Sequence, residues 1–125
     1  MTKYYFSAIF LIYSGFFQIL NAQLVLPTND SVLNYIHVLF EWNQYPEADS
    51  YNLEISTDSL FDSVIRTATV SSLIFIEEEI INWDSKYYWR IRPIFESSLT
   101  SEWSETYHFF TGQKRSESTV NIYDE

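Results

Sequence analysis

The sequence predicts an all-β fold, a small sandwich built from antiparallel strands. The main observation is the run at residues 87–92, in which bulky apolar side chains alternate with polar or amphipathic ones. Alternation with a period of two is typical of a strand that buries one face. Two upstream runs, at 51–56 and 38–42, show the same pattern. Because nothing after residue 22 shows sustained helical periodicity, these runs indicate packed sheets.

The first 22 residues are expected to be a secretory signal peptide. Lys3 gives a positive start, residues 4–20 are mostly apolar and carry no charge, and Ala22 is a small residue at the expected cleavage point. This order is the layout of an export signal. The alternative is a retained anchor, but the apolar run has about the minimum length of a membrane span and polar residues interrupt it. The sequence therefore favours a secreted, periplasmic or cell-envelope protein with no membrane span after cleavage.

Composition limits the domain count and excludes several classes of function. About a hundred residues remain after the signal, which is the size of one domain. The absence of cysteine excludes disulfides, thiol catalysis and zinc–thiolate sites. A net charge of −10 repels phosphate backbones, so nucleic-acid binding is not expected. With only two glycines, the chain has neither a glycine-rich phosphate loop nor a Gly-x-Ser-x-Gly nucleophile elbow.

Seven short strands with regular turn signals between them predict an immunoglobulin-like β-sandwich over residues 23–112. Residues 28–31 are expected to form a turn, and the acidic run at 77–79 is expected at an exposed turn because like charges repel. Residues 113–125 are expected to be a polar linker or the truncated start of a following domain. The predicted strands are 24–26, 36–42, 50–57, 61–69, 72–77, 86–95 and 106–111.

The alternation also predicts which side chains fill the core. The largest contribution is expected from aromatic rings, because each buries a large apolar area. The predicted core residues are Phe40, Trp42, Tyr51, Leu53, Ile55, Tyr87, Trp89, Ile91 and Phe109.

Several stretches resemble a fibronectin type III domain. The Phe-Glu-Trp run at 40–42, Pro46 and the Tyr-Asn-Leu-Glu-Ile run at 51–55 resemble its second and third strands. The spacing from Ile81 to Tyr87 and the tryptophan after it resemble the bacterial variety of the family. This likeness covers about residues 24–112 and implies a seven-stranded antiparallel sandwich. It says little about function, because one fold can serve many functions.

The resemblance assigns structural roles to a tyrosine and to a stack of charged and aromatic side chains. Tyr87 is the candidate tyrosine corner, whose hydroxyl would bond to the backbone near residues 81–83. The Thr-Ser-Glu-Trp-Ser run at 100–104 resembles the Trp-Ser-x-Trp-Ser box of cytokine receptors, although a threonine replaces its first tryptophan. Arg90 and Arg92 are expected on the outer face of the sixth strand, where Trp103 would stack on them by cation–π contact.

No catalytic, cofactor or metal site is expected. Both imidazoles, His37 and His108, are expected on outward faces, without the three or four converging ligands that zinc requires. The scattered acidic side chains are expected to form a solvated surface. Tyr45 and Trp83 are candidate ligand-facing rings in loops, and the simpler interpretation is that they cover the edges of the core.

The sequence therefore predicts a non-catalytic, exported module that acts as a spacer or binds an unknown protein or polysaccharide. Two alternatives remain open. In one, the chain is the N-terminal part of a larger secreted enzyme; the order of signal, module and polar linker resembles the front of secreted bacterial aryl-sulfate sulfotransferase-like proteins. In the other, it is a carbohydrate-binding module that uses Tyr45 or Trp83. A monomer is expected, because Pro27 and charge guard the sheet edges.

Overall fold

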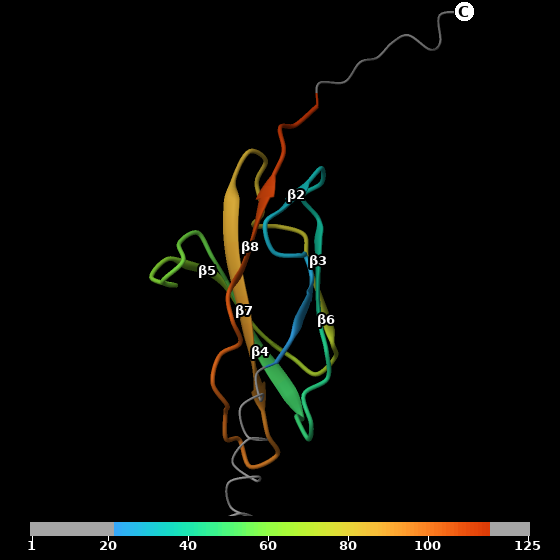
Figure 1. Ribbon diagram of the computed structural model, residues 1–125, viewed down its shortest axis with the longest axis vertical. Coiled ribbons are helices and arrows are strands. Elements are labelled where there is room, and N and C mark those ends of the chain that lie inside the picture. Colours follow the sequence, from blue (N-terminus) through green and yellow to red (C-terminus); the bar gives the residue numbers. More distant parts are fainter. Residues whose placement is uncertain (1–21, 116–125) are drawn as a thin grey trace, which may run out of the picture.

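The computed structural model describes residues 22–115 as two β-sheets packed face to face (Figure 1). One sheet has three strands in the order β1-β3-β6, and the other has five in the order β2-β8-β7-β4-β5. The expected all-β sandwich is therefore confirmed. The strands are β1 (Leu24–Leu26), β2 (Ser31–Leu33), β3 (Val38–Trp42), β4 (Ser50–Ser56), β5 (Val64–Val70), β6 (Ile74–Glu77), β7 (Lys86–Ile94) and β8 (Tyr107–Thr111).

Most of the expected signal peptide and of the expected linker lies outside the described residues, at 1–21 and 116–125. Ala22, expected to be the last residue of the signal, is described and is only 4% exposed, in contact with the core. Across residues 22–115, no helical segment has the length and hydropathy that a membrane span requires.

The prediction of seven antiparallel strands is wrong in number, and its antiparallel direction holds for every strand pair of residues 22–115 except one. The described residues form eight strands, and the additional one is β2, in and after the expected turn. Asp30 has a φ of 67°, and the Ser31 N–H donates to the Thr28 carbonyl at 3.2 Å. This turn sends the chain across to the other sheet, where β2 pairs parallel with β8. Because a turn was predicted at 28–31, no strand was predicted directly after it, although the apolar side chains of Val32 and Leu33 favour a short strand.

The facing surfaces of the two sheets form one core of interlocking rings. The nine residues predicted from alternation are all buried, and none is more than 3% exposed. The ring centroids of Phe40 and Trp89 lie 5.0 Å apart, and those of Trp42 and Tyr51 lie 5.6 Å apart, both in edge-to-face contact. Such pairs add about 0.5–1.5 kcal/mol beyond the area that they bury.

The prediction that the acidic run at 77–79 is exposed is wrong for its first residue. Glu77 is 1% exposed and occupies an inward position at the end of β6, opposite Val38. Its carboxylate accepts hydrogen bonds from the Arg66 guanidinium and from the N–H groups of Glu79 and Ile80. A buried carboxylate is tolerated when it is paired and hydrogen-bonded in this way. The Arg66–Glu77 pair thereby joins β5, at the edge of one sheet, to β6, at the edge of the other.

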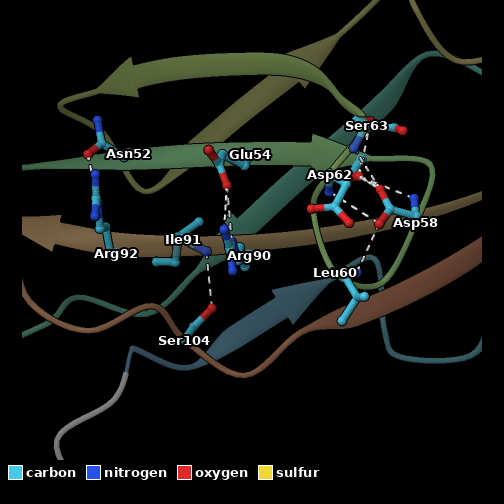
Figure 2. Close-up of polar contacts among 11 residues, drawn as sticks. Asn52, Glu54, Asp58, Leu60, Asp62, Ser63, Arg90, Ile91, Arg92 and Ser104 are labelled. Atoms are coloured by element: carbon cyan, nitrogen blue, oxygen red, sulfur yellow. Dashed lines mark hydrogen bonds and ion pairs between the residues drawn. The ribbon is translucent and has the colours of Figure 1, made fainter.

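The expected fourth strand begins later than predicted, because residues 58–63 fold into a tight loop. The Asp58 carboxylate accepts from the N–H groups of Leu60, Asp62 and Ser63, at 3.2, 3.2 and 2.7 Å (Figure 2). Asp residues favour such turns because their short carboxylates bond to nearby backbone. Phe61 stands inside this loop with a φ of 60° and is 8% exposed.

The described chain enters and leaves the sandwich at opposite ends of its strands. At one end, the Asn43 N–H donates to the Gln23 carbonyl at 2.9 Å. At the other end, the Gly112 N–H donates to the Leu33 carbonyl at 2.8 Å. Figure 1 shows the same arrangement, with β1 rising from the lower half of the domain and β8 leading out beyond its upper end.

Candidate functional site

The outer face of the five-stranded sheet carries a stack of alternating rings and guanidinium groups. The Arg90 guanidinium carbon lies 3.9 Å from the ring centroid of Phe61 and 4.2 Å from that of Trp103. The Arg92 guanidinium carbon lies 4.4 Å from the Trp103 ring centroid. We call these four side chains, Phe61, Arg90, Trp103 and Arg92, the cation–π stack. Each contact adds about 0.5–1 kcal/mol where solvent reaches it and more where it does not.

Strand β4 fixes the two guanidinium groups from the side. The Arg90 Nε and Nη2 atoms donate to Glu54 Oε1 at 3.1 and 2.8 Å, and Arg92 Nε donates to Asn52 Oδ1 at 3.1 Å (Figure 2). Both contacts follow from the register, which places Glu54 opposite Arg90 and Asn52 opposite Arg92. The two arginines are therefore hydrogen-bonded to β4 while their guanidinium groups contact the rings.

Ser104 holds Trp103 above the sheet. The Ser104 N–H donates to the Ile91 carbonyl at 2.8 Å, and the Ile91 N–H donates to Ser104 Oγ at 3.0 Å. These two bonds dock an irregular segment onto β7, one residue after Trp103, and Figure 2 shows the one from the Ile91 N–H to the Ser104 hydroxyl. Sequence reasoning missed the roles of Ser104 and Phe61. The likeness of residues 100–104 to the Trp-Ser-x-Trp-Ser box was a signal for the role of Ser104. No sequence signal indicated the role of Phe61, because this residue was predicted to lie in a strand.

Two buried tyrosines fasten loops at opposite ends of the domain. The Asn82 N–H donates to the Tyr87 hydroxyl at 2.8 Å, within the backbone stretch named for the tyrosine corner. At the other end, the Tyr45 N–H donates to the Tyr51 hydroxyl at 2.9 Å. Each hydroxyl belongs to a residue five or six positions further along the chain than the N–H group from which it accepts the hydrogen bond. Tyr51 was expected only as a core ring, so its loop contact is an additional role.

The two candidate ligand-facing rings do not come together. Tyr45 lies in the loop between β3 and β4, half-buried, with its ring centroid 5.8 Å from that of Phe95 in edge-to-face contact. Trp83 is half-buried in the connection before β7, at the opposite end of the sandwich. The two rings therefore cannot form one platform for a sugar chain.

No family model and no curated protein matches this chain. Solved structures do match it. A Fn3-like protein from Clostridium thermocellum aligns with 70% of this chain and 92% of its own length, at 21% identity and a TM-score of 0.54. The fold is that of a fibronectin type III-like domain. The fibronectin(III)-like modules of CbhA from the same organism align with 75% of this chain and 99% of their own length, at 9% identity and a TM-score of 0.51.

The fibronectin type III-like domain also resembles small parts of two enzymes. An alpha-L-rhamnosidase from Dictyoglumus thermophilum matches 74% of this chain with 12% of its own, at 17% identity and a TM-score of 0.58. A beta-1,2-glucanase from Parabacteroides distasonis matches 78% of this chain with 14% of its own, at 16% identity and a TM-score of 0.53. At these identities the likeness concerns the fold alone.

His108 and Asp58 of the fibronectin type III-like domain contact other groups of the same domain. His108 Nε2 lies 3.1 Å from Asp30 Oδ1, and His37 is exposed. Within residues 22–115, no three histidine or carboxylate side chains are grouped to hold a metal ion. Partial loss of solvent would raise the pKa of Asp58, but hydrogen bonds from the loop amides and from the Ser56 hydroxyl hold that pKa below its ordinary value.

Proposed function

We propose that this domain is a non-catalytic, exported spacer that holds the chain segments on its two sides at a fixed separation. The observation that carries the proposal is that the chain crosses the sandwich from one end to the other. The nine residues of β7 alone span about 30 Å at the usual rise of a β-strand. A flexible segment of the same number of residues would have a shorter and fluctuating length.

The packing supports a rigid unit. The core joins the two sheets from inside, the cation–π stack braces the outer face of β7, and the Arg66–Glu77 pair joins the sheets at one edge. The likeness to the fibronectin(III)-like modules of CbhA supports the same interpretation. Export remains a prediction from residues 1–22.

The hydrogen bonds of three serine and threonine hydroxyls and of one buried carboxylate support a role without catalysis. Catalytic side chains are commonly held in a cleft with a perturbed pKa and a free face toward substrate. In this domain, Ser56 bonds to Asp58, Ser104 to Ile91 and Thr111 to the Asn82 carbonyl, so these hydroxyls are occupied by the fold. Glu77 is likewise surrounded by its own donors.

A distance measurement between spin labels tests the spacer. The chain has no cysteine, so the double variant Gln23→Cys, Gln113→Cys of the full chain carries labels only at the two ends. Electron–electron double resonance should give one narrow distance distribution. A distribution as broad as that of a flexible linker would overturn the proposal. The matched control is Asn34→Cys with Gln113→Cys, which places both labels at the same end and should give a short distance.

A second proposal is that the module is one part of a larger secreted enzyme. It is favoured by the two enzymes described above, because the part that matches this domain makes up only 12% of one enzyme chain and 14% of the other. The resemblance to aryl-sulfate sulfotransferase-like proteins remains a prediction. Reading the gene past the codon for Glu125 tests this proposal: an in-frame continuation supports it, and a stop codon overturns it.

A further inference from the structure

A small pocket lies beside the segment in which the chain crosses from one sheet to the other, between β1 and β3. Its volume is about 390 Å³, and its lining residues fall between Leu26 and Leu39. We infer that this crossover pocket binds a neutral sugar. The inference goes beyond the proposed spacer function and does not depend on it. It follows from the rigidity of the pocket walls, from the lining side chains and from their lack of formal charge.

Both walls of the crossover pocket are held by backbone pairing. The turn that precedes β2 is fixed to β8, because the Asp30 N–H donates to the His108 carbonyl at 2.7 Å. The opposite wall includes Leu39 of β3, which lies opposite Ile76 where β3 pairs with β6. A site that is formed before its ligand arrives loses less free energy on ordering. The volume lies near the lower end of the range for small-molecule sites, which suits one or two sugar rings.

Apolar side chains and one aromatic ring form most of the lining. Tyr35 contributes the ring, and this residue is 52% exposed. A pyranose carries C–H groups on its ring faces, and such a face packs against an aromatic ring and aliphatic side chains. The aliphatic part of the lining comes from Leu26, Pro27, Leu33 and Leu39.

Uncharged polar side chains complete the lining: Thr28, Ser31 and His37. Thr28 and His37 are exposed, so the hydroxyl groups of a ligand can reach them. Ser31 Oγ is buried and has no hydrogen-bond partner within residues 22–115. Because buried hydroxyls in native proteins nearly always have a partner, we expect the Ser31 side chain to change its χ1 rotamer and bond to a ligand hydroxyl. An aliphatic ligand would leave this hydroxyl without a partner.

The crossover pocket has no formal charge, although the chain as a whole is acidic. None of its eight lining side chains, all within residues 22–115, is a carboxylate, an ammonium or a guanidinium group. The net charge of −10 repels an anionic ligand, and a cationic ligand finds no carboxylate in the lining. A neutral sugar needs only an apolar wall and hydrogen-bond partners, and the pocket provides both.

An NMR titration of the full chain tests the inference with defined probes. The neutral probes are cellobiose, maltose and lactose, and the charged controls are galacturonic acid and glucosamine. We expect at least one disaccharide to shift the backbone amide signals of Thr28, Tyr35 and His37, and the charged sugars to leave these signals in place. The inference is wrong if none of the disaccharides shifts them, or if a charged sugar shifts them equally.

Hexanol serves as a further probe, because it represents the apolar side chain of a partner protein. Shifts of the same amide signals with hexanol and with none of the disaccharides would assign the pocket to a protein partner and would also refute the inference.

Substitutions of Tyr35 supply the second measurement. Tyr35→Ala removes the ring and should weaken binding of the disaccharide roughly tenfold or more, whereas Tyr35→Phe keeps the aromatic face and should bind nearly as well as wild type. The matched control is Val32→Ala, because Val32 is 64% exposed and does not line the pocket. Unchanged affinity in Tyr35→Ala would contradict the inference.

The spin-label distances separate this inference from the spacer proposal. A narrow distance distribution without sugar binding leaves the spacer standing and removes the sugar site. Sugar binding together with a broad distribution has the opposite meaning.

Discussion

The two faces of β7 are built by different rules. On the inner face, Tyr87, Trp89 and Ile91 are buried by alternation against the opposite sheet. On the outer face, Arg90 and Arg92 are only half-buried and depend on Trp103 and Phe61, which arrive from irregular segments.

The difference shows which interactions a local pattern can specify. Burial at every second position needs only that the strand forms and that a second sheet covers it. Stacking on the outer face needs side chains from three separate segments to meet, and they meet only in the completed fold. The inner face should therefore dominate the free energy of unfolding, and the outer face should contribute smaller amounts.

The sharpest way to break this comparison is to truncate neighbouring residues on opposite faces. Trp89→Ala should lower the free energy of unfolding by about 3–5 kcal/mol, because it leaves a large cavity in a fully packed core. Tyr88→Ala, on the outer face of the same strand, should cost about 1 kcal/mol or less. Urea denaturation followed by circular dichroism measures both. Similar losses for the two variants would contradict the assignment of inner and outer faces.

The sequence was sufficient for the inner face, since the alternation in β3, β4, β7 and β8 predicted all nine core residues listed above as a group. It was insufficient for β2, because the turn signals at 28–31 outweighed a three-residue strand. It also failed for Glu77, whose burial depends on Arg66 at the edge of the other sheet. Phe61 was misplaced because the Asp58 carboxylate wraps its loop more tightly than side-chain periodicity reveals. The errors at β2 and Glu77 share a cause, since each is set by a partner outside its own segment, whereas the error at Phe61 comes from hydrogen bonds within its own loop.

Glu77 extends the comparison of inner and outer faces to a charged side chain, because it occupies an inward position. Glu77→Gln should lower the free energy of unfolding by about 2–3 kcal/mol, since it removes charged hydrogen bonds to Arg66 and weakens those to two backbone amides. The exposed neighbour Glu78 is the matched control, and Glu78→Gln should change stability by less than about 0.5 kcal/mol. Equal effects in the same urea titration would mean that the Glu77 ion pair adds nothing.

The acid dependence of stability tests the same carboxylate without truncation. Burial alone would raise the pKa of Glu77, but the Arg66 guanidinium and the amides of Glu79 and Ile80 together hold it below its ordinary value of 4.5. Because the folded pKa is depressed, this contribution is complete above pH 4.5 and is lost as the pH falls through the folded pKa. Wild type should therefore lose more stability than Glu77→Gln on acidification below that point. Parallel pH profiles for the two proteins would contradict a depressed pKa.

Substitutions of Trp103 test directly how much the outer face contributes to the free energy of unfolding. Trp103→Ala should lower the free energy of unfolding by about 1–2 kcal/mol, because both guanidinium groups lose the ring that they contact. Trp103→Phe keeps an aromatic face and should recover part of that loss. A cost below about 0.5 kcal/mol for the alanine variant, the range of an inert surface change, would show that the stack does not stabilise the fold.

The smallest expected effects belong to the two tyrosine hydroxyls at the ends of the domain. Tyr87→Phe and Tyr51→Phe each delete one hydrogen bond to a loop amide and keep the buried ring, so each should cost about 1 kcal/mol. Native-state hydrogen exchange should separate them: the Asn82 amide should lose protection in the first variant and the Tyr45 amide in the second. Because the two amides lie at opposite ends, each substitution is the control for the other. Loss of protection at both ends in either variant would mean that the loops are coupled through the core and are not fastened one by one.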